Sequence, residues 1–225
     1  SNYIGLILTQ LISILKGSPV TNTMLEVATS SNLWVNLFIM VLCAPVAEEL
    51  IFRKLLIDRL AQYGEGVAVL FSGLMFGLFH GNLNQFVYAF VLGLCFGFIY
   101  VKTGNIRYTI GLHMLVNFLG SVLGVAILKW LGDDFLSIAS DPAGMMSYMT
   151  GNFGKLIVYF IYIFLLLGVA IAGIILFIVN LKKIRFQSGM NTIPKGKRFS
   201  TTVLNVGMAL YMIVWIVIII VQLFQ

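Results

Sequence analysis

The sequence predicts an all-α, polytopic membrane protein with about seven transmembrane or membrane-embedded helices around an intramembrane cavity. Of its 225 residues, 60% are hydrophobic and only 10% are charged, whereas a soluble domain carries about 25% charged residues. Apolar segments recur along the chain, several of them long enough to cross a hydrocarbon core of roughly 30 Å. Their apolar residues run continuously instead of alternating with polar ones, which favours helices over a membrane-spanning barrel.

Seven apolar segments are predicted as helices, the first and third being shorter than the rest. The stretch 53–60 continues the second segment as an amphipathic extension along the interface. The turn-forming stretch "GNLNQ", directly after His80, predicts a break within or near the membrane. We find no internal repeat and expect a single membrane domain over residues 1–225. The predicted segments are 3–15, 32–52, 66–80, 85–101, 107–129, 153–181 and 201–224.

Basic residues predict the orientation of the chain in the membrane. The loop 182–198 carries six of the fourteen lysines and arginines and no acid, so we expect it on the cytoplasmic side. The loop 130–152, with Asp133, Asp134 and Asp141 and no basic residue, then lies outside. The net charge of +6 predicts attraction of the basic loop to anionic lipid and not binding to nucleic acid.

A few polar side chains stand inside or at the edge of the apolar segments, where an ionisable residue is a functional hypothesis by default. Residues four apart share one helical face, so Arg53 is positioned to pair with Glu49. Glu48 is turned by about 100° from Glu49 and must face something else. Pro45 removes a helical hydrogen bond and would bend the helix, opening a wet pocket at the two acids. These polar residues are Glu48, Glu49, Arg53, His80, His113 and Asn117.

Simpler interpretations of the same residues stay open. The two glutamates would also suit the interfacial end of a span, paired with nearby basic residues or lipid. His80 is compatible with a hydrogen-bonded core histidine at a helix end. His113 and Asn117, which share a helical face, would serve equally as polar contacts between membrane helices. The joint occurrence of all these residues on three successive spans favours a functional site.

Three short motifs on these spans resemble those of the CAAX-protease and bacteriocin-processing family of intramembrane endopeptidases, also called the Abi family. "EELIFR" fits E-E-x-x-x-R, "FGLFH" fits F-x-x-x-H and "HMLVN" fits H-x-x-x-N. The motifs follow one another in this order on successive predicted helices. The resemblance covers about residues 33–129, which we take as the catalytic core.

This resemblance implies an endopeptidase that hydrolyses peptide bonds of membrane-associated peptides or proteins with a glutamate-activated water. It also implies a bacterial plasma membrane protein. No cofactor is required by the sequence; zinc stays open, with Glu48, His80 and His113 as its ligands. By the same resemblance, Glu48 is the general base, His80 assists it, His113 and Asn117 stabilise the oxyanion, and Glu49 and Arg53 are supporting residues.

Two functions from other classes remain as alternatives. In a proton-coupled transporter, Glu48 and the histidines would form a proton relay, although no inverted repeat is evident. A non-catalytic scaffold of the same family would keep the motifs only for packing. Both alternatives use the same side chains, so the sequence alone does not separate them from a peptidase.

Overall fold

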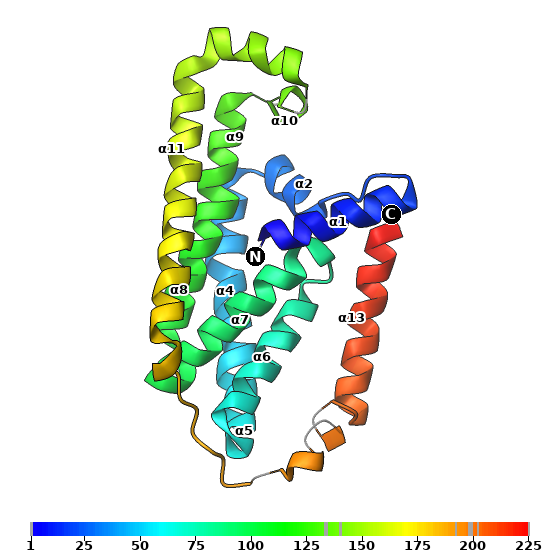
Figure 1. The fold of residues 1–225 in the computed structure, drawn as a ribbon, viewed down its shortest axis with the longest axis vertical. Coiled ribbons are helices and arrows are strands. Elements are labelled where there is room, and N and C mark those ends of the chain that lie inside the picture. Colours follow the sequence, from blue (N-terminus) through cyan, green and yellow to red (C-terminus); the bar gives the residue numbers. More distant parts are fainter. Residues whose placement is uncertain are drawn as a thin grey trace. The chain divides into compact units, whose positions relative to one another are not determined.

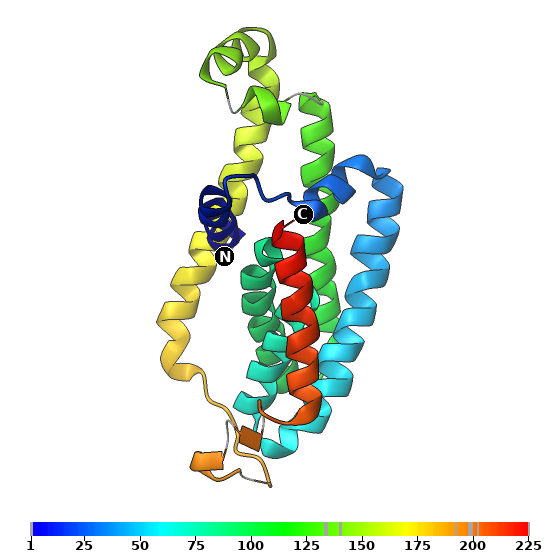
Figure 2. The ribbon, with the colours of Figure 1, turned by 90° about the vertical axis from the view of Figure 1, so that its right-hand side faces the viewer.

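The computed structural model describes residues 2–132, 135–139, 141–191, 193–197, 200–201 and 203–224 (Figures 1 and 2). Within these residues the chain forms helices joined by turns, and no strand. The all-α prediction is therefore confirmed. Asp133 and Asp134, which the predicted outer loop contains, lie outside the described residues.

Five helical stretches among the described residues are long and apolar enough to cross a membrane. The other two predicted segments correspond to shorter apolar helices, Gly5–Lys16 and Glu65–Phe79. A polytopic helical membrane protein is thus confirmed, with five full-length candidate spans where the sequence predicted about seven spanning or embedded helices. The five are Leu33–Tyr63, Leu83–Thr103, Ile106–Leu131, Pro142–Lys183 and Val206–Phe224.

The chain divides into two compact units, which we describe separately. Unit 1 comprises Ser1–Glu26, Leu42–Leu115 and Phe186–Gln225, and unit 2 comprises Val27–Val41 and Val116–Arg185. The single domain over 1–225 stays a prediction. Each unit contains its own buried polar residues, and those of unit 1 include the motif residues Glu49, Arg53 and His113.

The acid-bearing stretch is one continuous helical run with two π-helical parts. Pro45 stands at the start of α4 and donates no backbone hydrogen bond. The wider π-helical turns on either side accommodate such a defect, and they often mark functional sites. The run confirms that residues 53–60 continue the second predicted helix. Its parts are α3 (Leu33–Val35), η1 (Asn36–Cys43), α4 (Ala44–Glu49), η2 (Leu50–Ile57), α5 (Asp58–Leu60) and η3 (Ala61–Tyr63).

Helices α6 (Glu65–Phe79) and α7 (Leu83–Thr103) lie side by side in unit 1 (Figure 1). Glycines let the two backbones approach closely: a Cβ atom added at Gly93 would lie 2.8 Å from the Cα atom of Gly73. Such contacts between small residues are typical of membrane helices, where close van der Waals packing drives association. The contact between Gly73 and Gly93 was not predicted from the sequence.

The turn between α6 and α7 confirms the break predicted after His80. Gly81 has a φ of +64°, a left-handed conformation that glycine adopts without steric cost. Asn82 caps α7: its side-chain oxygen accepts from the backbone N–H of Gln85, and its amide donates to the His80 carbonyl at 2.9 Å. Gly81 is itself buried. The turn therefore fixes the position of His80, which directly follows the last residue of α6.

Two helices complete the surroundings of α6 and α7. Helix α1 (Asn2–Lys16) packs on α7, where the Thr9 hydroxyl donates to the Asn84 side chain at 2.8 Å. Helix α13 (Val206–Phe224) packs on α6, and the Tyr211 hydroxyl donates to the Met75 carbonyl at 2.7 Å. These polar contacts tie the flanking helices to the helices that carry the motifs.

The start of the predicted basic loop is held against the beginning of α6. The backbone of Glu65 donates to the Gln187 carbonyl at 3.1 Å, and the Gln187 N–H donates back to the Glu65 carboxylate at 2.8 Å. Lys102 forms an ion pair with the same carboxylate. This part of the loop therefore has a defined place in unit 1. Two short elements flank the segment, η5 (Leu181–Lys183) and η6 (Lys195–Lys197).

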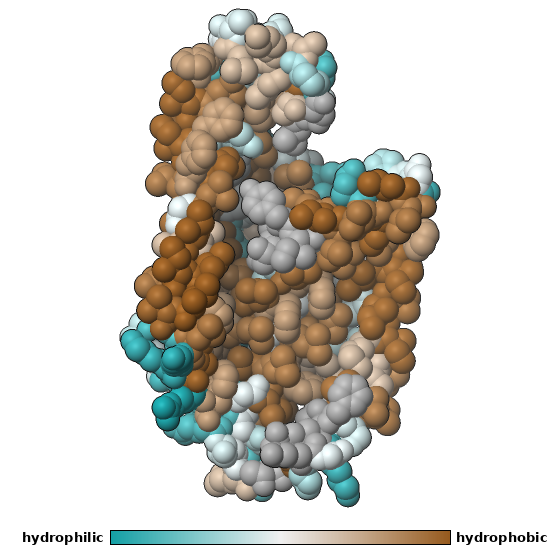
Figure 3. Space-filling model, viewed as in Figure 1, coloured by the Kyte–Doolittle hydropathy of each residue, from teal (hydrophilic) through white to brown (hydrophobic). Residues whose placement is uncertain are grey.

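Unit 2 is built around a long helix, α11, which starts earlier than the sequence predicted. The predicted span begins at residue 153, whereas α11 runs from Pro142 to Asn180 with a kink at Asn152. Figure 3 shows apolar residues along the part of α11 that follows the kink, as a lipid-facing helix requires. The remaining helices of the chain are α2 (Thr23–Ser30), α8 (Ile106–Asn117), η4 (Phe118–Gly124), α9 (Val125–Leu131) and α10 (Phe135–Ile138).

Candidate active site

Four of the predicted site residues meet inside unit 1. Glu48 and Glu49 end α4, Arg53 lies one turn further in η2, and His113 comes from α8. Together they form a charged cluster, the name used below for these four residues. Glu49 and Arg53 are completely buried and His113 is 4% exposed. Ions buried this deeply must compensate one another.

Glu49 is the centre of the charged cluster because each of its oxygens faces a different partner. Its Oε2 atom lies 3.1 Å from Nε of Arg53, which confirms the pairing predicted from their spacing. Its Oε1 atom lies 3.0 Å from Nδ1 of His113. A carboxylate only accepts hydrogen bonds, so Nδ1 of His113 carries a proton and donates it to Glu49.

Glu48 faces the other nitrogen of the same imidazole. Its Oε2 atom lies 3.7 Å from Nε2 of His113, too far for a direct hydrogen bond and close enough for a bridging oxygen. The Glu48 side chain keeps 18% of its surface exposed, whereas Glu49 keeps none. Adjacent glutamates thus have different surroundings: Glu49 is held on two sides, and Glu48 is partly accessible.

The ring of Phe76 joins His80 to the charged cluster. The His80 ring lies edge-on to Phe76 at 4.9 Å between centroids, and the His113 ring lies at 5.6 Å. The Arg53 guanidinium stands over the same ring at 4.4 Å, a cation–π contact that favours a buried cation. The motif phenylalanine therefore touches all three, a role that its sequence spacing with His80 did not reveal.

His80 is oriented by its own helix. Its Nδ1 atom lies 2.8 Å from the carbonyl oxygen of Phe76, one turn earlier. Since a carbonyl only accepts, Nδ1 carries the proton, and Nε2 of the neutral ring is left to accept. Tyr88, from α7, lies 6.4 Å from the His80 ring, and its hydroxyl accepts from the Gln85 amide at 2.9 Å. The sequence analysis did not predict a role for Gln85 and Tyr88. The signal that could have revealed them is a pair of polar residues three apart, directly after the turn.

Asn117 follows His113 by one turn of α8 but belongs to unit 2. Its side-chain amide donates to the Met40 carbonyl at 2.7 Å, and its backbone carbonyl accepts from the Ser121 hydroxyl at 2.7 Å. Nearby, the buried amide of Asn36 donates to the carbonyls of Ala28 at 2.8 Å and Ser121 at 3.1 Å. Asn36, Asn117 and Ser121 are called the amide cluster below. Because the Asn117 amide donates to Met40, one of its two N–H bonds is already used within unit 2.

The three residues left open as zinc ligands, Glu48, His80 and His113, are not gathered into a metal-binding group. Among the residues that the structure describes, no three or more histidine, cysteine or acidic side chains gather where a metal ion could be held. The Nδ1 atoms of His80 and His113 are engaged in hydrogen bonds, which leaves Nε2 as the free nitrogen of each ring.

Comparison with known proteins identifies the segment that carries this site. Residues 30–119 match the family described as type II CAAX prenyl endopeptidase Rce1-like. This part of the chain, called the Rce1-like segment below, is similar to that family. All the predicted site residues lie inside the Rce1-like segment, and the resemblance predicted from the three motifs is confirmed.

Two curated bacterial relatives point the same way. The chain is 26% identical over 153 residues to the membrane-embedded CAAX protease MroQ of Staphylococcus aureus (strain USA300), covering 65% of this chain and 59% of MroQ. It is 32% identical over 74 residues to YdiL of Bacillus subtilis (strain 168), a protein described as a membrane peptidase, covering 32% of this chain and 30% of YdiL. The chain thus spans 59% of the length of MroQ and 30% of the length of YdiL. No solved structure matches it.

Proposed function

We propose that the protein is an intramembrane endopeptidase that cleaves peptide bonds of membrane-associated peptides or proteins with a water activated by Glu48. The observation that carries the proposal is that the two adjacent glutamates have different surroundings. Glu49 is fixed between Arg53 and His113, while Glu48 faces Nε2 of His113 and remains 18% exposed. The Rce1-like segment supports the same reaction class.

In the proposed reaction, Glu48 takes a proton from water as the water oxygen attacks the scissile carbonyl carbon. The C=O π electrons move to oxygen and give a tetrahedral oxyanion. Glu48 then returns the proton to the amide nitrogen, and the C–N bond breaks. A positioned general base of this kind accelerates a reaction by about 10²–10⁴-fold. Its partial exposure suits the task because water can reach the side chain.

The two histidines take different parts in this scheme. His80, whose Nε2 is left to accept, orients the attacking water. His113 donates from Nε2 only as the imidazolium, because its other proton is committed to Glu49. In that form the two acids, Arg53 and His113 sum to zero charge, and the Nε2–H group, which lies beside Glu48, would donate to the developing oxyanion. Donors in a poorly hydrated site stabilise such charge most strongly.

Asn117 is proposed as the second oxyanion donor through the amide N–H that Met40 leaves free. Glu49 and Arg53 are proposed to act indirectly. Glu49 fixes which nitrogen of His113 faces the reacting atoms, and Arg53 offsets the charge of Glu49. Since both are fully buried, they position other groups and do not touch the substrate.

The setting of the reaction is also part of the proposal. The basic loop 182–198 would lie in the cytoplasm against anionic lipid, the protein would reside in a bacterial plasma membrane, and the site would open in the cytoplasmic half of the bilayer. Substrates would then be peptides or protein tails presented at that face.

Glu48→Gln tests the proposal directly. Peptide products from cells with the wild-type protein are compared by mass spectrometry with those from cells with Glu48→Gln. Asp58→Asn is the control, because Asp58 is an exposed acid on the same helical run, paired with Lys54. We expect Glu48→Gln to remove the products and Asp58→Asn to keep them, with equal expression and melting temperature. Unchanged products from Glu48→Gln would refute the proposed base.

A further inference from the structure

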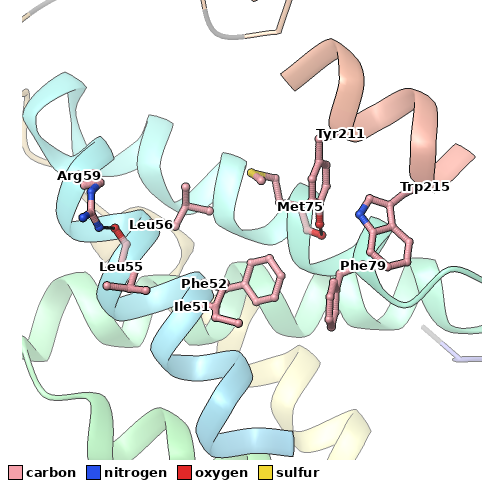
Figure 4. A pocket seen from close by; sticks show the side chains of 9 residues that line it. All are labelled: Ile51, Phe52, Leu55, Leu56, Arg59, Met75, Phe79, Tyr211 and Trp215. Atoms are coloured by element: carbon pink, nitrogen blue, oxygen red, sulfur yellow. Dashed lines mark hydrogen bonds between the residues drawn. The ribbon is translucent and has the colours of Figure 1, made fainter. Parts of the chain in front are cut away.

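Unit 1 contains a second hollow, separate from the charged cluster. It has a volume of about 380 Å³ and lies between η2, α6 and α13 (Figure 4). This is near the lower end of the roughly 300–1,000 Å³ of ligand pockets, so it suits one chain of a larger molecule. The lining is almost entirely apolar: Ile51, Phe52, Leu55, Leu56, Met75, Phe79, Tyr211 and Trp215, with Arg59 as its one charged residue.

The single charge lies at one end of the hollow. In Figure 4, Arg59 stands at the opposite end of the lining from Phe79 and Trp215. Its guanidinium donates to the Leu55 carbonyl at 3.0 Å, which occupies one of five donors. Within the described part of the chain Arg59 makes no ion pair with a carboxylate, whereas its neighbour Lys54 is paired with Asp58 at 2.7 Å. The hollow therefore ends at an exposed cation with donors to spare.

The two ends of the hollow match the two ends of a phospholipid. On the predicted orientation, Arg59 belongs to the cytoplasmic side, where anionic headgroups attract basic residues. Trp215 lies nine residues into α13 from Val206, so that end of the lining reaches about 14 Å along the helix. An acyl chain that enters beside Arg59 would therefore run toward the membrane interior, as the chains of that leaflet do.

We propose that this hollow binds one anionic phospholipid, with an acyl chain in the apolar lining and the phosphate at Arg59. Arg59 recognises the headgroup charge, and aromatic rings close the far end, where Phe79 and Trp215 meet at 5.1 Å between centroids. The occupant is a lipid of the bilayer, present at high concentration beside α13, which needs no attachment to a substrate. The proposal is independent of the proposed peptidase activity, because it concerns binding alone.

Trp215 supplies the measurement, since it lines the hollow. Trp34 and Trp130 are exposed by 76% and 49%, so both can be changed to phenylalanine to leave Trp215 as the sole tryptophan. This protein is reconstituted in phosphatidylcholine vesicles that contain a small fraction of acyl-brominated phosphatidylglycerol or, in the matched sample, acyl-brominated phosphatidylcholine. Bromine quenches tryptophan fluorescence only at contact.

We expect half-maximal quenching at an about fivefold lower fraction of brominated phosphatidylglycerol than of brominated phosphatidylcholine, from about 1 kcal/mol of attraction per basic residue. Arg59→Gln should remove this preference, and Lys54→Gln, an exposed cation on the same helix outside the lining, should keep it. Leu55→Phe, which narrows the hollow, should weaken quenching by phosphatidylglycerol, and Leu50→Phe, outside the lining, should not.

Equal quenching by the two headgroups, or a preference that survives Arg59→Gln, would overturn the proposal. Those outcomes would mean that the hollow is open to any lipid or is a site for an apolar peptide. Should Arg59→Gln misfold, as judged by size-exclusion profile, native mass spectrometry of the wild-type protein decides instead. If the proposal holds, the wild-type protein retains phosphatidylglycerol in preference to phosphatidylcholine from an equimolar mixture. Loss of both lipids alike counts against the site.

Discussion

The charged cluster of unit 1 and the amide cluster of unit 2 solve the same problem by different means. Both place polar groups inside apolar helices next to a π-helical turn. In the charged cluster, Glu49 depends on two charged or ionisable side chains: Arg53, one turn away on the same helical run, and His113, from α8. In the amide cluster, Asn36 and Asn117 bond mainly to backbone carbonyls.

The difference predicts how each cluster responds to change. A buried ion pair compensates the cost of removing two charges from water, so removing one partner leaves the other charge buried and uncompensated. An amide that bonds to carbonyls loses only modest hydrogen bonds, which average well under 2 kcal/mol within membranes. The charged cluster should therefore be fragile and specific, and the amide cluster should be tolerant.

Arg53→Met should give the largest loss of stability. Methionine keeps much of the volume beside Phe76 but removes the guanidinium that pairs with Glu49. We expect a loss of about 3–5 kcal/mol, the usual cost of breaking a buried ion pair on one side. Unfolding in detergent micelles, followed by circular dichroism, measures it.

Lys54→Met is the matched control for Arg53→Met. Lys54 is the next residue, and its pair with Asp58 is exposed at 56% and 42%, so its loss should cost about 0–1 kcal/mol. Equal losses in the two variants would mean that burial does not distinguish the pairs and that the comparison between the clusters is wrong.

Adding Glu49→Gln to Arg53→Met should restore part of the lost stability. The double change removes the buried negative charge and keeps an acceptor for Nδ1 of His113. We expect the double variant to be more stable than Arg53→Met by about 0.5–3 kcal/mol. A strictly additive double-mutant cycle would show that Glu49 and Arg53 are not coupled.

The sequence predicted the parts of the site that depend on local geometry. The Glu49–Arg53 pair follows from a spacing of four, and the turn after His80 follows from glycine and asparagine. The contact of His113 with Glu49 joins separate helices, and no spacing encodes it. Asn36 was overlooked because a single amide in an apolar run gives little periodic signal, although it is completely buried.

The early start of α11 was missed for a different reason. Hydropathy begins near residue 153, yet Asp141 caps the helix by accepting from two backbone N–H groups, and Pro142 follows at the first helical position. Both are ordinary helix-start signals. They were outweighed by the polar composition of the first turns, and the predicted start instead coincides with the kink at Asn152.

Asn36→Leu should have the smallest effect and sharpens the comparison most. Leucine has a similar size, suits the surrounding apolar residues and gives up two hydrogen bonds, to Ala28 and Ser121. The Asn36 Oδ1 atom has no hydrogen-bond partner among the described residues, so its removal offsets part of that loss. We expect a decrease of about 0.6–1.7 kcal/mol in the same unfolding assay. A loss as large as that of Arg53→Met would mean that the amides are as indispensable as the ions, and buried charge would then not be what sets the site apart.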